Sequence, residues 1–123
     1  MTERVSIEVV EGDTWRLQLQ VLDSAGAAYD FTSQTAHMDI RRATNSADPL
    51  TSLTDGSGLT LDSPSAGFIE VAVPSDATEG VCRSTNTETL YSDIELRSAD
   101  DPPVVTTLAR IKWLVQPEAT HRV

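Results

Sequence analysis

The stretch WRLQLQV, residues 15–21, alternates apolar and polar side chains without a break. Successive side chains of a β-strand point to opposite faces, so this stretch turns one apolar face to a core and one polar face to water. Period two recurs along most of the chain. Only residues 74–80 (PSDATEG) favour a helical turn, with Ser75 as its N-cap. The sequence therefore predicts an all-β protein.

Further alternating stretches surround this strand and are separated by clusters of turn residues. Additional strands are expected at residues 5–10, 36–41, 50–54, 59–61, 68–73, 90–96 and 104–115. About seven short strands at such spacing indicate an antiparallel sandwich or barrel, and we favour the sandwich. The expected organisation is one β-sandwich domain over residues 1–116 and a flexible C-terminal tail over residues 117–123.

Composition and charge exclude several classes of partner. The 123 residues include 19 acidic and 9 basic ones, which gives a formal net charge of −10 at pH 7. Nucleic-acid-binding surfaces need clustered Lys and Arg, and anionic membranes attract the same residues, so we expect no nucleic acid and no membrane as partner. No run approaches the roughly 18 apolar residues that span a bilayer, and no signal-peptide pattern opens the chain.

Cys82 is the single cysteine, which excludes an internal disulfide and a cysteine-based zinc site. A reducing cytoplasm is therefore the simplest site of synthesis. Arg83 beside the thiol favours a slightly lowered pKa of Cys82, but no partner base is evident, and we expect a partly buried loop thiol. Residues 81–89 are polar and rich in Thr, and they fit a contact loop or simple slack equally well.

Patterns typical of an active site are absent from the sequence. A hydrolytic triad would need His37 or His121 beside a nucleophile and an orienting acid, and no Gly-x-Ser-x-Gly motif supports one. No dinucleotide-binding glycine pattern or calcium-loop spacing occurs. Carboxylates such as Asp93 and Glu95 are typical of solvated strand faces. We predict no catalytic residues, no cofactor and no metal, in a protein that is not an enzyme.

Two apolar clusters indicate a contact surface. Val10 is an apolar residue on the otherwise polar face of the first strand. Leu114 lies between Trp113 and Val115 in the last strand and is apolar where a polar residue is expected. Terminal strands often lie near sheet edges, where a partner can add. Val10 and Leu114 are therefore our interface candidates; the alternative is that a neighbouring loop covers Leu114.

Several motifs, in the same order, resemble those of a known family. VVEGDTWRL, residues 9–17, resembles the "(I/V)-x-x-G-D-T-(F/W)-x-L" opening of small immunoglobulin-like proteins in the structural modules of tailed phages, among them N-terminal domains of upper baseplate proteins. Similar motifs follow at residues 21–32, 36–41, 67–71 and 92–96. Two features depart from the pattern: Ala28 stands where the family usually has proline, and residues 81–89 are longer than its usual link.

This resemblance implies an immunoglobulin-like antiparallel β-sandwich of about seven strands. It also implies a non-enzymatic structural protein of a tailed-phage virion, most simply a tail or baseplate adaptor. Such an adaptor docks neighbouring virion proteins by shape and edge pairing, in a symmetric multi-copy assembly. It is made in the host cytoplasm and resides in the virion.

Two alternatives stay open. The first is a capsid decoration (cement) protein that clamps neighbouring capsomers. The second is a carbohydrate-binding module for host surface glycans, which would need exposed aromatic side chains. Only 5% of the residues are aromatic, and Trp15 and Trp113 lie on apolar strand faces, so Tyr29 and Tyr91 are the plausible platforms.

Overall fold

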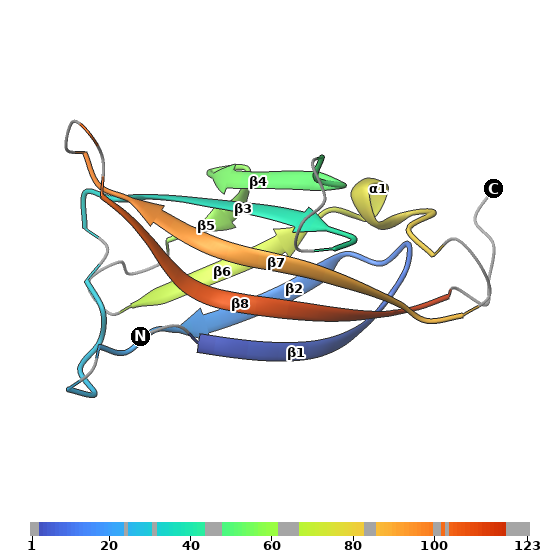
Figure 1. Ribbon diagram of the computed structural model, residues 1–123, viewed down its shortest axis with the longest axis horizontal. Coiled ribbons are helices and arrows are strands. Elements are labelled where there is room, and N and C mark those ends of the chain that lie inside the picture. Colours follow the sequence, from blue (N-terminus) through green and yellow to red (C-terminus); the bar gives the residue numbers. More distant parts are fainter. Residues whose placement is uncertain are drawn as a thin grey trace.

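A computed structural model of the protein describes residues 3–23, 25–30, 32–43, 48–61, 67–82, 86–99, 102 and 104–117. The elements are β1 (Glu3–Val10), β2 (Trp15–Gln20), β3 (Thr35–Arg41), β4 (Thr51–Asp55), β5 (Gly58–Thr60), β6 (Phe68–Val73), α1 (Ser75–Thr78), β7 (Glu88–Arg97) and β8 (Val105–Gln116). The strands form one eight-stranded sheet in the order β1-β8-β7-β3-β4-β5-β6-β2, which curls into a nearly closed barrel (Figure 1).

The all-β prediction is confirmed, but the immunoglobulin-like sandwich is not. The sheet is continuous, because the short β4 and β5 pair in parallel and link β3 on one side of the barrel to β6 on the other. The strong right-handed twist of strands allows such a sheet to close on itself. The domain boundary at residue 116 stays a prediction, and residues 118–123 of the expected tail lie outside the described residues.

The core fills the inside of the barrel with side chains from alternate strand positions. Trp113 is fully buried, and its ring stacks on Trp15 with 5.3 Å between the ring centroids. The indole of Trp113 donates a hydrogen bond to Ser92 Oγ at 2.9 Å, and that of Trp15 donates one to the Val10 carbonyl at 2.8 Å. Both tryptophans are therefore core residues, as the sequence predicts.

Strand β8 contains a β-bulge that sets the direction of its side chains. The register with β7 shifts between Ile94 and Glu95, and the consecutive residues Leu108 and Ala109 are both buried. Beyond the bulge, β8 alternates regularly, with Ile111, Trp113 and Val115 buried among exposed or half-buried neighbours. The alternate polar positions of β8 therefore all point away from the core.

The sheet ends at β1 and β2, which follow each other in the chain. The expectation that terminal strands lie at an edge is right for β1 but wrong for β8. The reason is that β1 runs parallel to β8 and covers its outer side, so that β8 lies between β1 and β7. Leu114 is thus on an internal strand of the sheet.

The helical turn is present, although the capping residue differs from the prediction. Helix α1 begins at Ser75, its N-cap is Pro74, and no side chain caps it. Instead, the hydroxyl of Thr78 donates to the Ser75 carbonyl at 3.1 Å and to the Asp13 carbonyl at 2.6 Å. These bonds tie α1 to the turn between β1 and β2.

Candidate functional site

The side chains that point outward from β1, β8, β7 and β3 form one surface, which we call the outer face. Strand pairing arranges these side chains in rows across the four strands. The outer face comprises Arg4, Ser6, Glu8 and Val10 of β1; Arg110, Lys112 and Leu114 of β8; Tyr91, Asp93 and Glu95 of β7; and His37, Asp39 and Arg41 of β3.

One row crosses the outer face with two acids followed by two bases. Asp39 pairs with Asp93, Asp93 pairs with Arg110, and Arg110 pairs with Arg4. Like charges directly opposite each other on neighbouring strands are unfavourable. Asp93 and Arg110 in the middle of the row have opposite charges, but Asp39 and Arg4 at its two ends each face a like charge and need compensation from other rows or from outside the molecule.

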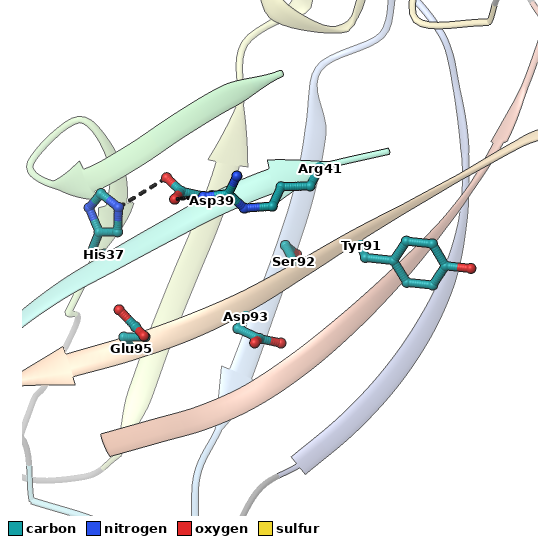
Figure 2. Close-up of a pocket in the computed structure, with 7 residues that line it drawn as sticks. All are labelled: His37, Asp39, Arg41, Tyr91, Ser92, Asp93 and Glu95. Carbon is teal, nitrogen blue, oxygen red and sulfur yellow. Dashed lines mark hydrogen bonds and ion pairs between the residues drawn. The ribbon is translucent and has the colours of Figure 1, made fainter. Parts of the chain in front are cut away.

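The acidic half of this row is compensated from within the protein. His37 and Arg41 lie two positions to either side of Asp39 on β3 and therefore share its face (Figure 2). The Asp39 carboxylate contacts His37 Nε2 at 3.0 Å, accepts a hydrogen bond from Arg41 at 2.8 Å, and accepts another from Ser52 Oγ at 2.6 Å. His37, Asp39 and Arg41 line a hollow of about 170 Å³ together with Asp93 and Glu95 of β7.

This cluster lowers the pKa of Asp39. Partial burial of the carboxyl raises the pKa, but the hydrogen bond from Ser52, the charge and hydrogen bond of His37 and the hydrogen bond from Arg41 together outweigh it. The folded protein consequently binds the Asp39 proton less tightly than the unfolded chain does. Its contribution to stability is present above the unfolded-state pKa and is lost as the pH falls through the folded-state pKa.

We expect Asp39→Asn to lower the free energy of unfolding by about 1–2 kcal/mol at pH 7. Hydrogen bonds to charged groups contribute about 1.5–3 kcal/mol, and relief of the repulsion from Asp93 offsets part of the loss. The difference from the wild type should shrink steadily in acid, as urea titrations at a series of pH values would show. Asp48→Asn, at an exposed loop position, is the control that should change little. A difference that is independent of pH would contradict this assignment.

The contacts of His37 do not form a hydrolytic triad. In a triad, the histidine lies between the nucleophile and the acid, and it takes the proton of the nucleophile. Here Asp39 lies in the middle, because it receives hydrogen bonds from both Ser52 and His37. The Ser52 proton is directed to a carboxylate whose pKa is lowered, which is a poor base. His121 lies outside the described residues.

The structure places both interface candidates on the outer face. Val10 is 37% exposed, and Leu114 is half-buried. In the parallel register, Leu114 pairs with Glu8 and Val10 pairs with Gln116. Val10 and Leu114 are therefore diagonal neighbours on adjacent strands. The two residues are more than a hundred positions apart in the sequence, and the pairing of β1 with β8 brings them together.

Three basic side chains near these candidates were missed by sequence analysis. Arg110 and Lys112 alternate with buried residues of β8, so their outward direction follows from the sequence pattern. Nothing local in the sequence indicates that Arg4, from the other end of the chain, lies beside Arg110. The position of Arg4 depends on which strands pair.

Cys82 is half-buried, as expected, but the pKa of its thiol is raised and not lowered. Burial and the nearby Glu11 carboxylate raise the pKa of Cys82, so the slightly lowered value is wrong. Glu11 is held there because it accepts a hydrogen bond from the Cys82 backbone N–H at 2.9 Å. Arg83 lies outside the described residues.

Among the described residues, no group of three or more His, Cys, Asp or Glu side chains could hold a metal ion. Within the same part of the chain, no helix is long and apolar enough to cross a membrane.

Comparison with solved structures shows a similar fold in a phage protein. The chain aligns with the N-terminal domain of phage TP901-1 ORF48 with a TM-score of 0.59 and 9% identity, over 94% of this chain and 99% of that one. The two share a fold. At this level of identity, the likeness concerns the fold alone.

Other comparisons add no information on function. A nucleoside hydrolase-related hypothetical protein from Saccharophagus degradans, associated with carbohydrate metabolism, aligns with a TM-score of 0.43 and 15% identity, over 91% of this chain and 22% of that one. That likeness is too weak to carry an argument. No protein-family model matches the chain, and the search of curated proteins finds no match.

Proposed function

We propose that this protein is a structural component of a tailed-phage virion, and that it acts as a tail or baseplate adaptor without enzymatic activity. The observation that carries the proposal is the fold shared, almost end to end, with the N-terminal domain of a phage protein, TP901-1 ORF48. The ordered motifs within residues 9–96 resemble the same class of protein and support the proposal independently.

The proposed mechanism is docking through the outer face. Val10 and Leu114 supply apolar contact area, and the free edge of β1 beside them offers backbone groups to a partner strand. In a symmetric multi-copy assembly the same contact is repeated, so that a modest affinity for each contact suffices. The net charge of −10 keeps the free subunit soluble in the host cytoplasm before assembly.

Electron microscopy of purified particles with gold-labelled antibodies against this protein tests the adaptor proposal. An adaptor should be labelled at the tail or baseplate, whereas a capsid decoration protein should be labelled over the head. Labelling of the head alone would replace the adaptor with the decoration protein. If blotting detects the protein in particles that carry no label, its epitope is buried inside the particle.

The carbohydrate-binding alternative has little support from the positions of its aromatic candidates. Tyr29 packs against the core, while Tyr91 lies on the outer face of β7, beside Lys112. A stacking platform needs its aromatic ring exposed to the sugar, which the position of Tyr29 does not favour. If a glycan is retained equally by the wild type and by Tyr29→Ala/Tyr91→Ala, these side chains do not bind it.

A further inference from the structure

The basic half of the charged row on the outer face lacks the compensation that the acidic half receives. Arg4 lies directly opposite Arg110, and Lys112 follows two positions along β8. Arg110 contacts Asp93 at 3.7 Å, with both side chains more than half exposed, where an ion pair contributes little. We call Arg4, Arg110 and Lys112 the basic patch.

Two members of the basic patch differ from the other cations of the protein. Each of the other arginines within the described ranges contacts a carboxylate: Arg16 with Glu70, Arg41 with Asp39, Arg42 with Glu88, Arg97 with Glu95 and Arg110 with Asp93. In the same ranges, no ion pair involves Arg4 or Lys112. The chain has 19 acidic and only 9 basic residues, yet no described carboxylate forms an ion pair with Arg4 or Lys112.

The surface between these cations is hollowed. A depression of about 350 Å³ is lined by all three members of the basic patch, together with Ser6, Tyr91 and Asp93. Tyr91 pairs with Lys112 across the β7–β8 ladder, so an aromatic ring adjoins the cations. Such a depression can accept the carboxylate side chains of another polypeptide, since Arg and Lys both donate charge-assisted hydrogen bonds to carboxylates.

The protein itself presents carboxylates of this kind at one end of the barrel. Residues 11–14 and 74–80 contain four acidic residues and no Lys or Arg. The two segments are joined by the Gly12–Thr78 backbone hydrogen bond at 3.2 Å and by the Thr78–Asp13 hydrogen bond. Asp13, Asp76 and Glu79 are exposed there, and we call these three residues the acidic end.

The basic patch and the acidic end occupy different parts of the molecule. Helix α1 and the turn from β1 to β2 lie at one end of the barrel, whereas β1 starts away from that end (Figure 1). Arg4 is the second residue of β1. Contact between two such different surfaces is head-to-tail. Repeated head-to-tail contact generates a ring when the rotation closes.

We propose that the basic patch binds the acidic end of a second copy of this protein, so that copies associate head to tail. The opposite charges of the two surfaces support this pairing, because complementary charges steer association and set its specificity. The inference extends the proposed virion role by naming one partner. Its test uses purified protein alone, so that its outcome does not depend on whether the protein enters particles.

The test uses two variants that each reverse the charge of one surface in the full chain. Arg4→Glu/Lys112→Glu changes the basic patch, and Asp76→Lys/Glu79→Lys changes the acidic end. By sedimentation velocity, the wild type should associate with increasing concentration, and each variant alone should lose at least tenfold in affinity. An equimolar mixture should recover paired species, because one variant keeps an intact acidic end and the other keeps an intact basic patch.

Controls separate this contact from effects of net charge and folding. Arg16→Glu/Arg97→Glu makes the same change in net charge at exposed cations outside the basic patch, and it should associate like the wild type. Circular dichroism should show an unchanged fold in every variant. High salt should weaken the wild-type association, since the screening length falls from about 8 Å at physiological ionic strength to about 3 Å at 1 M.

Two results would overturn the proposal. The first is a wild type that stays monomeric at every attainable concentration, and the second is a mixture that stays monomeric. If the wild type is monomeric and its binding to purified particles is lost in Arg4→Glu/Lys112→Glu, the basic patch binds the carboxylates of a different virion protein instead.

Discussion

Trp113→Ala is expected to lower the free energy of unfolding by about 3–5 kcal/mol, the range typical of large-to-small changes at buried aromatic positions. Trp113 is fully buried at the centre of the barrel. Its ring stacks on Trp15 of β2, a strand that is not a hydrogen-bonded neighbour of β8. Removal of the indole therefore leaves a cavity between opposite sides of the barrel and deprives Ser92 of its hydrogen-bond donor.

Urea unfolding followed by circular dichroism measures this loss. Ser92→Ala serves as the comparison, because it removes the hydrogen bond and leaves the stacked rings in place. It should lower the free energy of unfolding by about 1–3 kcal/mol, the cost of leaving one buried donor without its partner. If Trp113→Ala cost less than Ser92→Ala, the ring stacking would not hold the two sides of the barrel together.

Leu114→Asp, at the next residue of the chain, is expected to affect assembly and not stability. It should leave a soluble, folded protein and abolish incorporation into particles. The side chain of Leu114 lies on the outer face, so that its replacement creates no cavity in the core. The new carboxylate would, however, place a charge in the centre of the proposed apolar contact, where burying an unpaired charge is costly. Complementation of a phage that lacks the gene, followed by blotting of purified particles, measures incorporation.

Leu22→Asp is a matched control for this prediction. Leu22 is exposed to about the same degree as Val10, but it lies in the turn that follows β2 and not on the outer face. This variant should be incorporated normally. Normal incorporation of Leu114→Asp would remove Leu114 from the interface, and loss of both variants would move the interface away from the outer face.

The strands were predictable because their signal is local. The alternation over residues 15–21 and over residues 109–115 follows directly from the two-residue period of a strand with one buried face. The burial of both tryptophans follows from the same alternation. Pairing between distant strands has no such local signal, so the continuous sheet and the internal position of β8 could not be predicted.

The candidate site was predictable in part for the same reason. Val10 and Leu114 interrupt the alternation and were therefore visible in the sequence. The cluster around Asp39 could have been anticipated, because His37, Asp39 and Arg41 occupy alternate positions of one strand and must share a face. The basic patch could not, since Arg4 reaches Arg110 only through the parallel pairing of β1 with β8.

The most direct test of the virion role is the copy number of this protein in purified particles. Quantitative mass spectrometry against the major capsid protein provides it. An adaptor in the low-order rings of a tail should be present at roughly six to a few dozen copies per particle. Hundreds of copies would instead indicate a decoration protein of the head, and absence from the particles would contradict the virion role altogether.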